Sequence, residues 1–63
     1  MTMVTFEATI KEKGGAVLHP TYTVPNEDAK YKDKRFFIDF WGLNNDDVEE
    51  WEIEKEGELL WQK

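Results

Sequence analysis

Glutamate occupies every second position from 50 to 58, within the stretch VEEWEIEKEGE. Residues that alternate with a period of two point to opposite faces of a β-strand. The alternation predicts a strand over 48–55 whose Trp51 and Ile53 face a core. Three glutamates of this strand would face solvent: Glu50, Glu52 and Glu54. The pair Glu56-Gly57 is typical of a hairpin turn, so we expect a short last strand after it.

The N-terminal third shows the same alternation. Residues 3–10, MVTFEATI, place apolar side chains at every second position, and residues 16–24, AVLHPTYTV, resume the pattern. Between them, Gly14-Gly15 suits a hairpin turn because glycine adopts a positive φ without steric strain. Pro20 has no N–H for a ladder hydrogen bond, so the second strand lies at an edge of the sheet or breaks there. The first 24 residues therefore predict a β-hairpin.

The middle of the chain predicts a helix over about 27–41. Asn26 is a favoured N-cap residue, and Gly42 suits the C′ position at which the backbone turns left-handed, with Leu43 making the apolar contact that follows it. The core-facing stripe of this helix would consist of aromatic and small residues: Ala29, Phe36, Phe37 and Phe40. Asp33 interrupts that stripe.

Residues 35–41, RFFIDFW, also fit a strand. They are rich in strand-forming residues, and in a helix their apolar side chains would surround most of the circumference. The sequence therefore predicts a small α+β single domain over 1–63 with the order ββαββ: an N-terminal hairpin, one helix, and a C-terminal strand or hairpin. The alternative is an all-β small barrel or sheet in which 35–41 is a strand.

So short a chain needs a compact source of stability. A domain of about 60 residues buries only about 60% of the surface that its unfolded chain exposes. With no cysteine and one histidine, neither a disulfide nor a zinc site built from Cys and His is available. Aromatic residues make up 14% of the chain, which favours a dense aromatic core or burial of aromatic side chains by self-association.

Charge is unevenly distributed along the chain. The net charge is −6, which disfavours nonspecific binding to nucleic acid or to an anionic membrane and favours a basic partner. Residues 30–35 carry four cations and one carboxylate, for a net charge of +3. Residues 46–58 carry eight carboxylates and one lysine, for a net charge of −7. This separation is a physical feature that any proposal for function has to address.

The glutamate row is the first candidate for a partner-binding surface. Evenly spaced carboxylates on a strand resemble the charge of a nucleic-acid backbone, which carries about one charge per 3.4 Å of axis on each strand. The ordinary explanation is a solvated strand face that discourages aggregation. On the functional interpretation, the protein is an inhibitor or modulator that docks this face onto a basic protein, such as a nucleic-acid-handling protein, a role that would suit a phage or mobile-element protein. The residues expected to bind are Glu50, Glu52, Glu54, Glu56, Trp51, Trp41 and Phe37.

Two other functions remain open. A homodimer could bury the aromatic face of residues 36–41, since aromatic side chains are enriched at interaction hot spots. A weak binder of single-stranded nucleic acid could use the cations and rings of 30–37, because cations contact phosphates and rings stack on bases. The residues of this nucleic-acid alternative are Lys30, Tyr31, Lys32, Lys34 and Arg35. The net charge opposes it, and those cations also fit the solvent face of a helix.

Enzymatic chemistry has little support. The chain has no serine and no cysteine, so the commonest activated nucleophiles are missing. The acidic loop before Val48 lacks the spacing and central glycine of a calcium loop, and His19 has no second ligand type nearby. We expect no enzyme activity, no metal and no cofactor. The N-terminus lacks the features of a signal peptide, and no apolar run is long enough to cross a membrane, so we expect a cytoplasmic protein that does not bind membranes.

Overall fold

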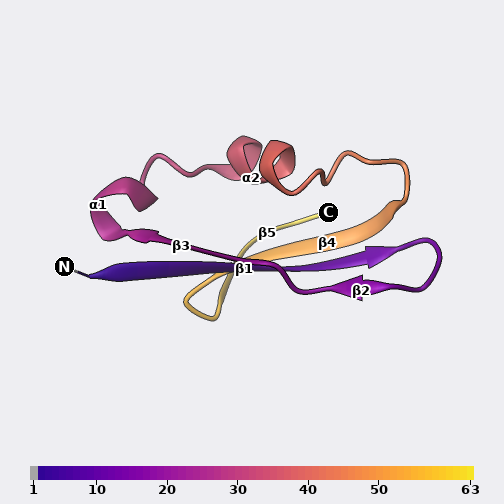
Figure 1. Cartoon of the computed structure of the whole chain (residues 1–63), viewed down its shortest axis with the longest axis horizontal. Helices are drawn as coiled ribbons and strands as arrows, with labels where there is room; N and C mark the ends of the chain where they lie inside the picture. The colour runs from indigo at the N-terminus through magenta and orange to yellow at the C-terminus, as the bar shows by residue number, and fades with distance from the viewer. Residues whose placement is uncertain (1) are drawn as a thin grey trace.

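A computed structural model describes residues 2–63 (Figure 1). Within these residues, five strands form one antiparallel sheet, and two short helices lie against one of its faces. In chain order the elements are β1 (Met3–Glu12), β2 (Val17–Leu18), β3 (Thr21–Pro25), α1 (Asn26–Ala29), α2 (Lys34–Phe40), β4 (Val48–Lys55) and β5 (Glu58–Gln62). The result is a small sheet-dominated domain with a short helical segment.

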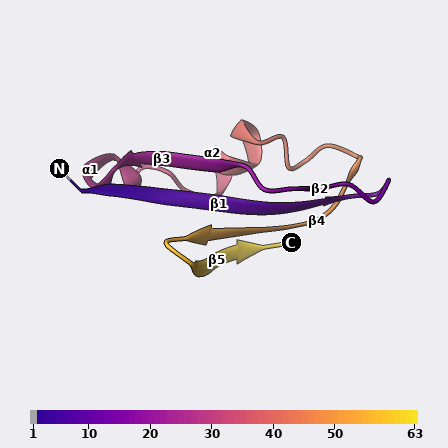
Figure 2. The same cartoon turned by 60° about the horizontal axis from the view of Figure 1, so that its bottom comes forward.

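β1 lies at the centre of the sheet. β4 pairs with one side of β1, with Ala8 opposite Ile53, and β5 pairs with the outer side of β4. β2 and β3 share the other side of β1, where Val4 lies opposite Val24. Figure 2 shows β5 and β3 at opposite margins of this arrangement. All neighbouring strands are antiparallel, so each can present one apolar face to a common core.

The predicted N-terminal hairpin is confirmed, with a break in its second strand. β2 ends before His19, and β3 begins after Pro20. The carbonyl of Pro20 accepts a hydrogen bond from the Ala8 N–H at 3.0 Å, but its nitrogen has no hydrogen to donate in return. The ladder is therefore interrupted at the proline, as the sequence indicated.

The single helix predicted over 27–41 is wrong, because the chain forms two short helices separated by residues 30–33. Asp33 has an extended backbone, and its carboxylate accepts the Phe36 N–H at 2.9 Å, which makes it the N-cap of α2. Asn26, the predicted N-cap, is instead the first residue of α1, which begins without a side-chain cap. The order ββαββ is accordingly not confirmed.

The C-terminal end of α2 forms as the sequence predicted. Gly42 has a φ of +64° directly after the C-cap residue Trp41. The Leu43 N–H then donates to the Ile38 carbonyl at 2.9 Å, which is the six-to-one bond of a Schellman motif. Leu43 is buried in the core cluster, and Ile38 packs against the same cluster. With both ends capped, 34–40 is helical, and the alternative of a strand over 35–41 is wrong.

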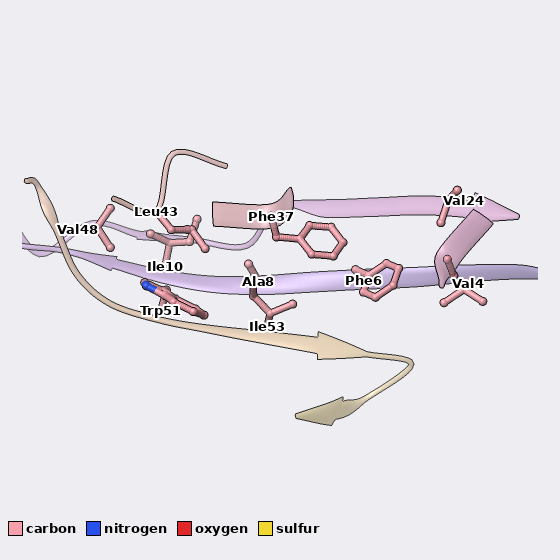
Figure 3. Close-up of a cluster of buried hydrophobic side chains, with 11 residues drawn as sticks. Val4, Phe6, Ala8, Ile10, Val24, Phe37, Leu43, Val48, Trp51 and Ile53 are labelled. Atoms are coloured by element: carbon pink, nitrogen blue, oxygen red, sulfur yellow. The ribbon is translucent and has the colours of Figure 1, made fainter. Parts of the chain in front are cut away.

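The core lies between one face of the sheet and the helical segment. Phe37 of α2 is fully buried and contacts Phe6 of β1, with 4.7 Å between ring centroids (Figure 3). The rest of the core comes mainly from alternate residues of β1 and β4 and from the segments that flank α2: Val4, Ala8, Ile10, Val24, Ala29, Leu43, Val48, Trp51 and Ile53. The predicted helix stripe is correct for Ala29 and Phe37 but not for Phe40, which is 54% exposed.

Candidate functional site

One face of the sheet has no helical cover. Figures 1 and 2 show α1 and α2 on the same side of the strands, and the strand registers place the other set of alternating side chains on the opposite side. We call this side the open face. Its residues on β1, β3, β4 and β5 are Met3, Thr5, Glu7, Thr9, Lys11, Thr21, Thr23, Pro25, Glu50, Glu52, Glu54, Leu59 and Gln62.

The open face is acidic and poorly neutralised. Its four glutamates share the face with a single cation, Lys11, whose ammonium lies 3.6 Å from the Glu50 carboxylate. That ion pair is exposed and contributes little to stability. Glu7 lies directly opposite Glu54, and like charges in this position destabilise a sheet. Threonine lies opposite both Glu7 and Glu52, on β3 and β1 respectively, so these contacts supply no neutralising charge.

Glu7 is the site residue that the sequence did not single out. Alternation in 3–10 already placed it on the polar side of its strand. Its importance depends on the pairing of β1 with β4, which brings it beside Glu54 across 47 positions of the chain. A strand's own alternation does not identify its neighbour, so the sequence held no direct signal for this contact.

Glu56 leaves the row of glutamates. Glu56 and Gly57 have φ values of +49° and +84° and form the two-residue turn between β4 and β5, as expected for a type I′ turn. The Glu56 N–H donates to the Thr5 carbonyl at 3.1 Å, and its carboxylate accepts the Thr5 N–H at 2.8 Å. This glutamate therefore ties the turn to β1, and the row on β4 is limited to Glu50, Glu52 and Glu54.

A shallow cavity lies where the open face meets this turn. It has a volume of about 240 Å³, and its lining residues are Thr5, Glu7, Glu54, Glu56 and Gly57. Three of the five carry carboxylates, so a cationic group is the chemistry that this hollow best accommodates.

The aromatic candidates lie on the other side of the sheet. Trp51 and Phe37 are buried in the core, so neither can contact a partner in the folded protein, and we leave them out of the candidate surface. Trp41 is half-buried and stacks on Phe37 at 4.8 Å between centroids. These rings stabilise the fold, and the glutamates and the exposed part of Trp41 are what remains accessible of the predicted surface.

The cations of the basic and aromatic stretch of 30–35 contact different parts of the molecule. The Lys32 ammonium lies 4.5 Å from the Phe36 ring centroid, on the side of α2 that contacts β3. The Lys34 ammonium lies 5.9 Å from the ring of Trp51, on β4. Arg35 pairs with Asp39 at 3.4 Å. Lys30 and Tyr31 are exposed. The Lys30 ammonium lies 5.2 Å from the centroid of the Tyr31 ring.

A larger cavity of about 450 Å³ lies between α2, the loop after it and the end of the chain. Its lining is of mixed charge and includes three lysines and two acidic residues: Lys13, Lys34, Lys63, Asp46 and Glu49. Residues 2–63 contain no group of three or more histidine, cysteine or acidic side chains arranged to hold a metal ion. In the same part of the chain, no helix has the length and apolar character needed to cross a membrane.

No protein-family model, curated protein or solved structure matches this chain. A proposal for its function therefore depends on its own residues and their geometry. The open face is the most distinctive of these features, because it combines an uncovered sheet with unneutralised charge.

Proposed function

We propose that this protein is a small acidic binding module whose open face docks onto a basic surface of another protein, which it inhibits or modulates. The observation that supports this proposal is the juxtaposition of Glu7 and Glu54 on an uncovered sheet with one cation. A face selected only for solubility would gain stability from lysine opposite glutamate. A partner that supplies cations would explain why Glu7 and Glu54 lie opposite each other.

The layout of the carboxylates suits a partner that presents several cations. On β4, successive outward residues lie about 6.6 Å apart, and β1 adds Glu7 about 4.8 Å away on the next strand. The hollow beside Glu7, Glu54 and Glu56 has room for one guanidinium or ammonium group. Proteins that handle nucleic acids carry such arrays of cations, so a nucleic-acid-handling protein is the partner class that we favour.

The test compares two variants of equal net charge. Glu7→Gln/Glu52→Gln/Glu54→Gln removes three charges from the open face, and Glu27→Gln/Asp28→Asn/Asp46→Asn removes three exposed charges from the helical side. Each leaves a net charge of −3, so a difference between them reports the location of the charges. Immobilised wild-type and variant proteins are compared by quantitative affinity capture, and the captured partner is then titrated against each. We expect the open-face variant to lose at least about tenfold in affinity, or about 1.4 kcal/mol, and the control to bind like wild type.

Equal weakening of both variants would contradict the proposal, because it would mean that only net charge matters. Binding unchanged in the open-face variant would contradict it as well. A second measurement uses salt: the affinity of wild type should fall as ionic strength rises from 50 to 200 mM, since exposed charges are screened over about 10 Å.

A further inference from the structure

The two margins of the sheet differ in how well they are protected. Pro20 interrupts the margin formed by β2 and β3, and Pro25 ends it. β5 forms the other margin, and within residues 2–63 it pairs only with β4 (Figure 2). Its sequence, ELLWQ, contains none of the lysines or prolines that natural edge strands use against further pairing, and its one irregularity is a register shift against β4 between Ile53 and Glu54.

β5 also exposes apolar side chains. Leu59 is 52% exposed and Leu60 is 39% exposed. Leu59 lies opposite Glu54, so its side chain borders the acidic part of the open face. An apolar side chain beside carboxylates suits lysine or arginine, whose methylene stem packs on apolar surface while its charge reaches an anion.

Backbone groups of β5 are free to pair outward. The Lys63 N–H donates to the Trp51 carbonyl at 3.0 Å, which makes this a hydrogen-bonded position of the β4–β5 ladder. Hydrogen-bonded and non-hydrogen-bonded positions alternate in an antiparallel pair. Gln62, opposite Glu52, therefore directs its N–H and C=O away from β4.

We propose that an extended basic segment of the partner adds a sixth strand beside β5. Its main chain would pair with outward groups such as those of Gln62. Alternate lysine or arginine side chains would lie over Leu59 and reach Glu52 and Glu54, and the intervening residues would lie on the side of Trp61. This inference rests on the proposed function and names the form of the partner. A second copy of this chain fits less well, because its β5 has no cation and Lys63, which follows β5, lines the cavity on the helical side instead of the open face.

The test uses two fluorescent peptides of equal charge. One is an octapeptide that alternates lysine with valine and can form a strand; in the other, proline replaces each valine and prevents strand pairing. Binding is measured by fluorescence anisotropy at 50 and 150 mM salt. We expect the lysine–valine peptide to bind at least about tenfold more tightly, since a few additional main-chain hydrogen bonds contribute about 1 kcal/mol each.

Matched variants at one position locate the binding edge. Gln62→Pro removes the outward N–H without removing a β4–β5 hydrogen bond, and proline is tolerated on strand edges. Gln62→Ala removes the side chain but keeps the N–H. The proline variant should lose the preference for the lysine–valine peptide, and the alanine variant should keep it, with circular dichroism and thermal unfolding confirming that both are folded.

Several results would overturn the inference. Equal affinity for the two peptides would do so while leaving the acidic-face proposal intact, since charge alone would then explain binding. No binding of either peptide, or full preference in Gln62→Pro, would also refute strand addition. If sedimentation shows wild type to be a dimer and Gln62→Pro a monomer, a second copy occupies the edge instead. The proposed function fails on a different result, the unchanged binding of the open-face triple variant.

Discussion

At the scale of single residues, Glu56 shows how a repeated residue type can have different roles along one strand. Glu52 and Glu54 project from the open face, but Glu56 has a positive φ and two hydrogen bonds to Thr5. Glutamate is an unusual choice for the first position of a type I′ turn, where asparagine or glycine is favoured. The carboxylate bond to Thr5 offsets part of that conformational cost.

Glu56→Ala should lower the free energy of unfolding by about 1 kcal/mol, because the Thr5 N–H loses its acceptor. Alanine and glutamate share the same strain at positive φ, so the backbone cost of the turn does not change. Urea unfolding monitored by tryptophan fluorescence measures the change. A loss below about 0.3 kcal/mol would mean that water replaces the carboxylate without cost.

At the scale of elements, capping decides where the helical segment is divided. In one continuous helix over 27–41, Asp33 would lie on the side that faces the core. The chain instead breaks at this residue and uses its carboxylate to cap α2. Phe37 then enters the core one turn later, and the Schellman motif at Gly42 ends the helix.

Asp33→Ala should lower the free energy of unfolding by about 1 kcal/mol, which is typical for loss of an N-cap. Asp33→Asn should retain most of this stability, because its amide oxygen can accept the same Phe36 N–H. Asn26→Ala serves as the comparison, since the structure has no side-chain cap at the start of α1. Thermal unfolding of the three variants measures these changes. If Asn26→Ala lowered the stability more than Asp33→Ala, Asp33 would not be the important helix cap.

At the scale of the whole molecule, the fold is a thin slab with extents of 40 × 19 × 14 Å. Its core fills one side of the sheet, and the open face holds unneutralised glutamates on the other. If the open face binds a basic partner as we propose, stability and binding make opposing demands on the same surface. A face shaped for a basic partner carries a small electrostatic cost when the partner is absent.

Glu54→Gln should consequently raise the free energy of unfolding by roughly 0.5 kcal/mol at low salt, because it removes the repulsion from Glu7. The gain should shrink as sodium chloride is added, since salt screens the repulsion in wild type. Urea unfolding at 20 and 300 mM salt measures both effects. A destabilising Glu54→Gln would show that this carboxylate supports the fold.

Local features of the sequence determined most of the elements. Alternation in 3–10 and 48–55 identified the strands, and Glu56-Gly57 and Gly42 marked a turn and a helix end, because these signals act within a few residues. Tertiary structure decided the rest. Pairing of β1 with β4 set Glu7 against Glu54. Packing of the helical segment on the sheet buried Trp51 and Phe37, whose core-facing positions the sequence patterns had already indicated. These outcomes depend on contacts between distant segments. The helical segment covers only one face of the sheet, so the acidic face on the other side stays open.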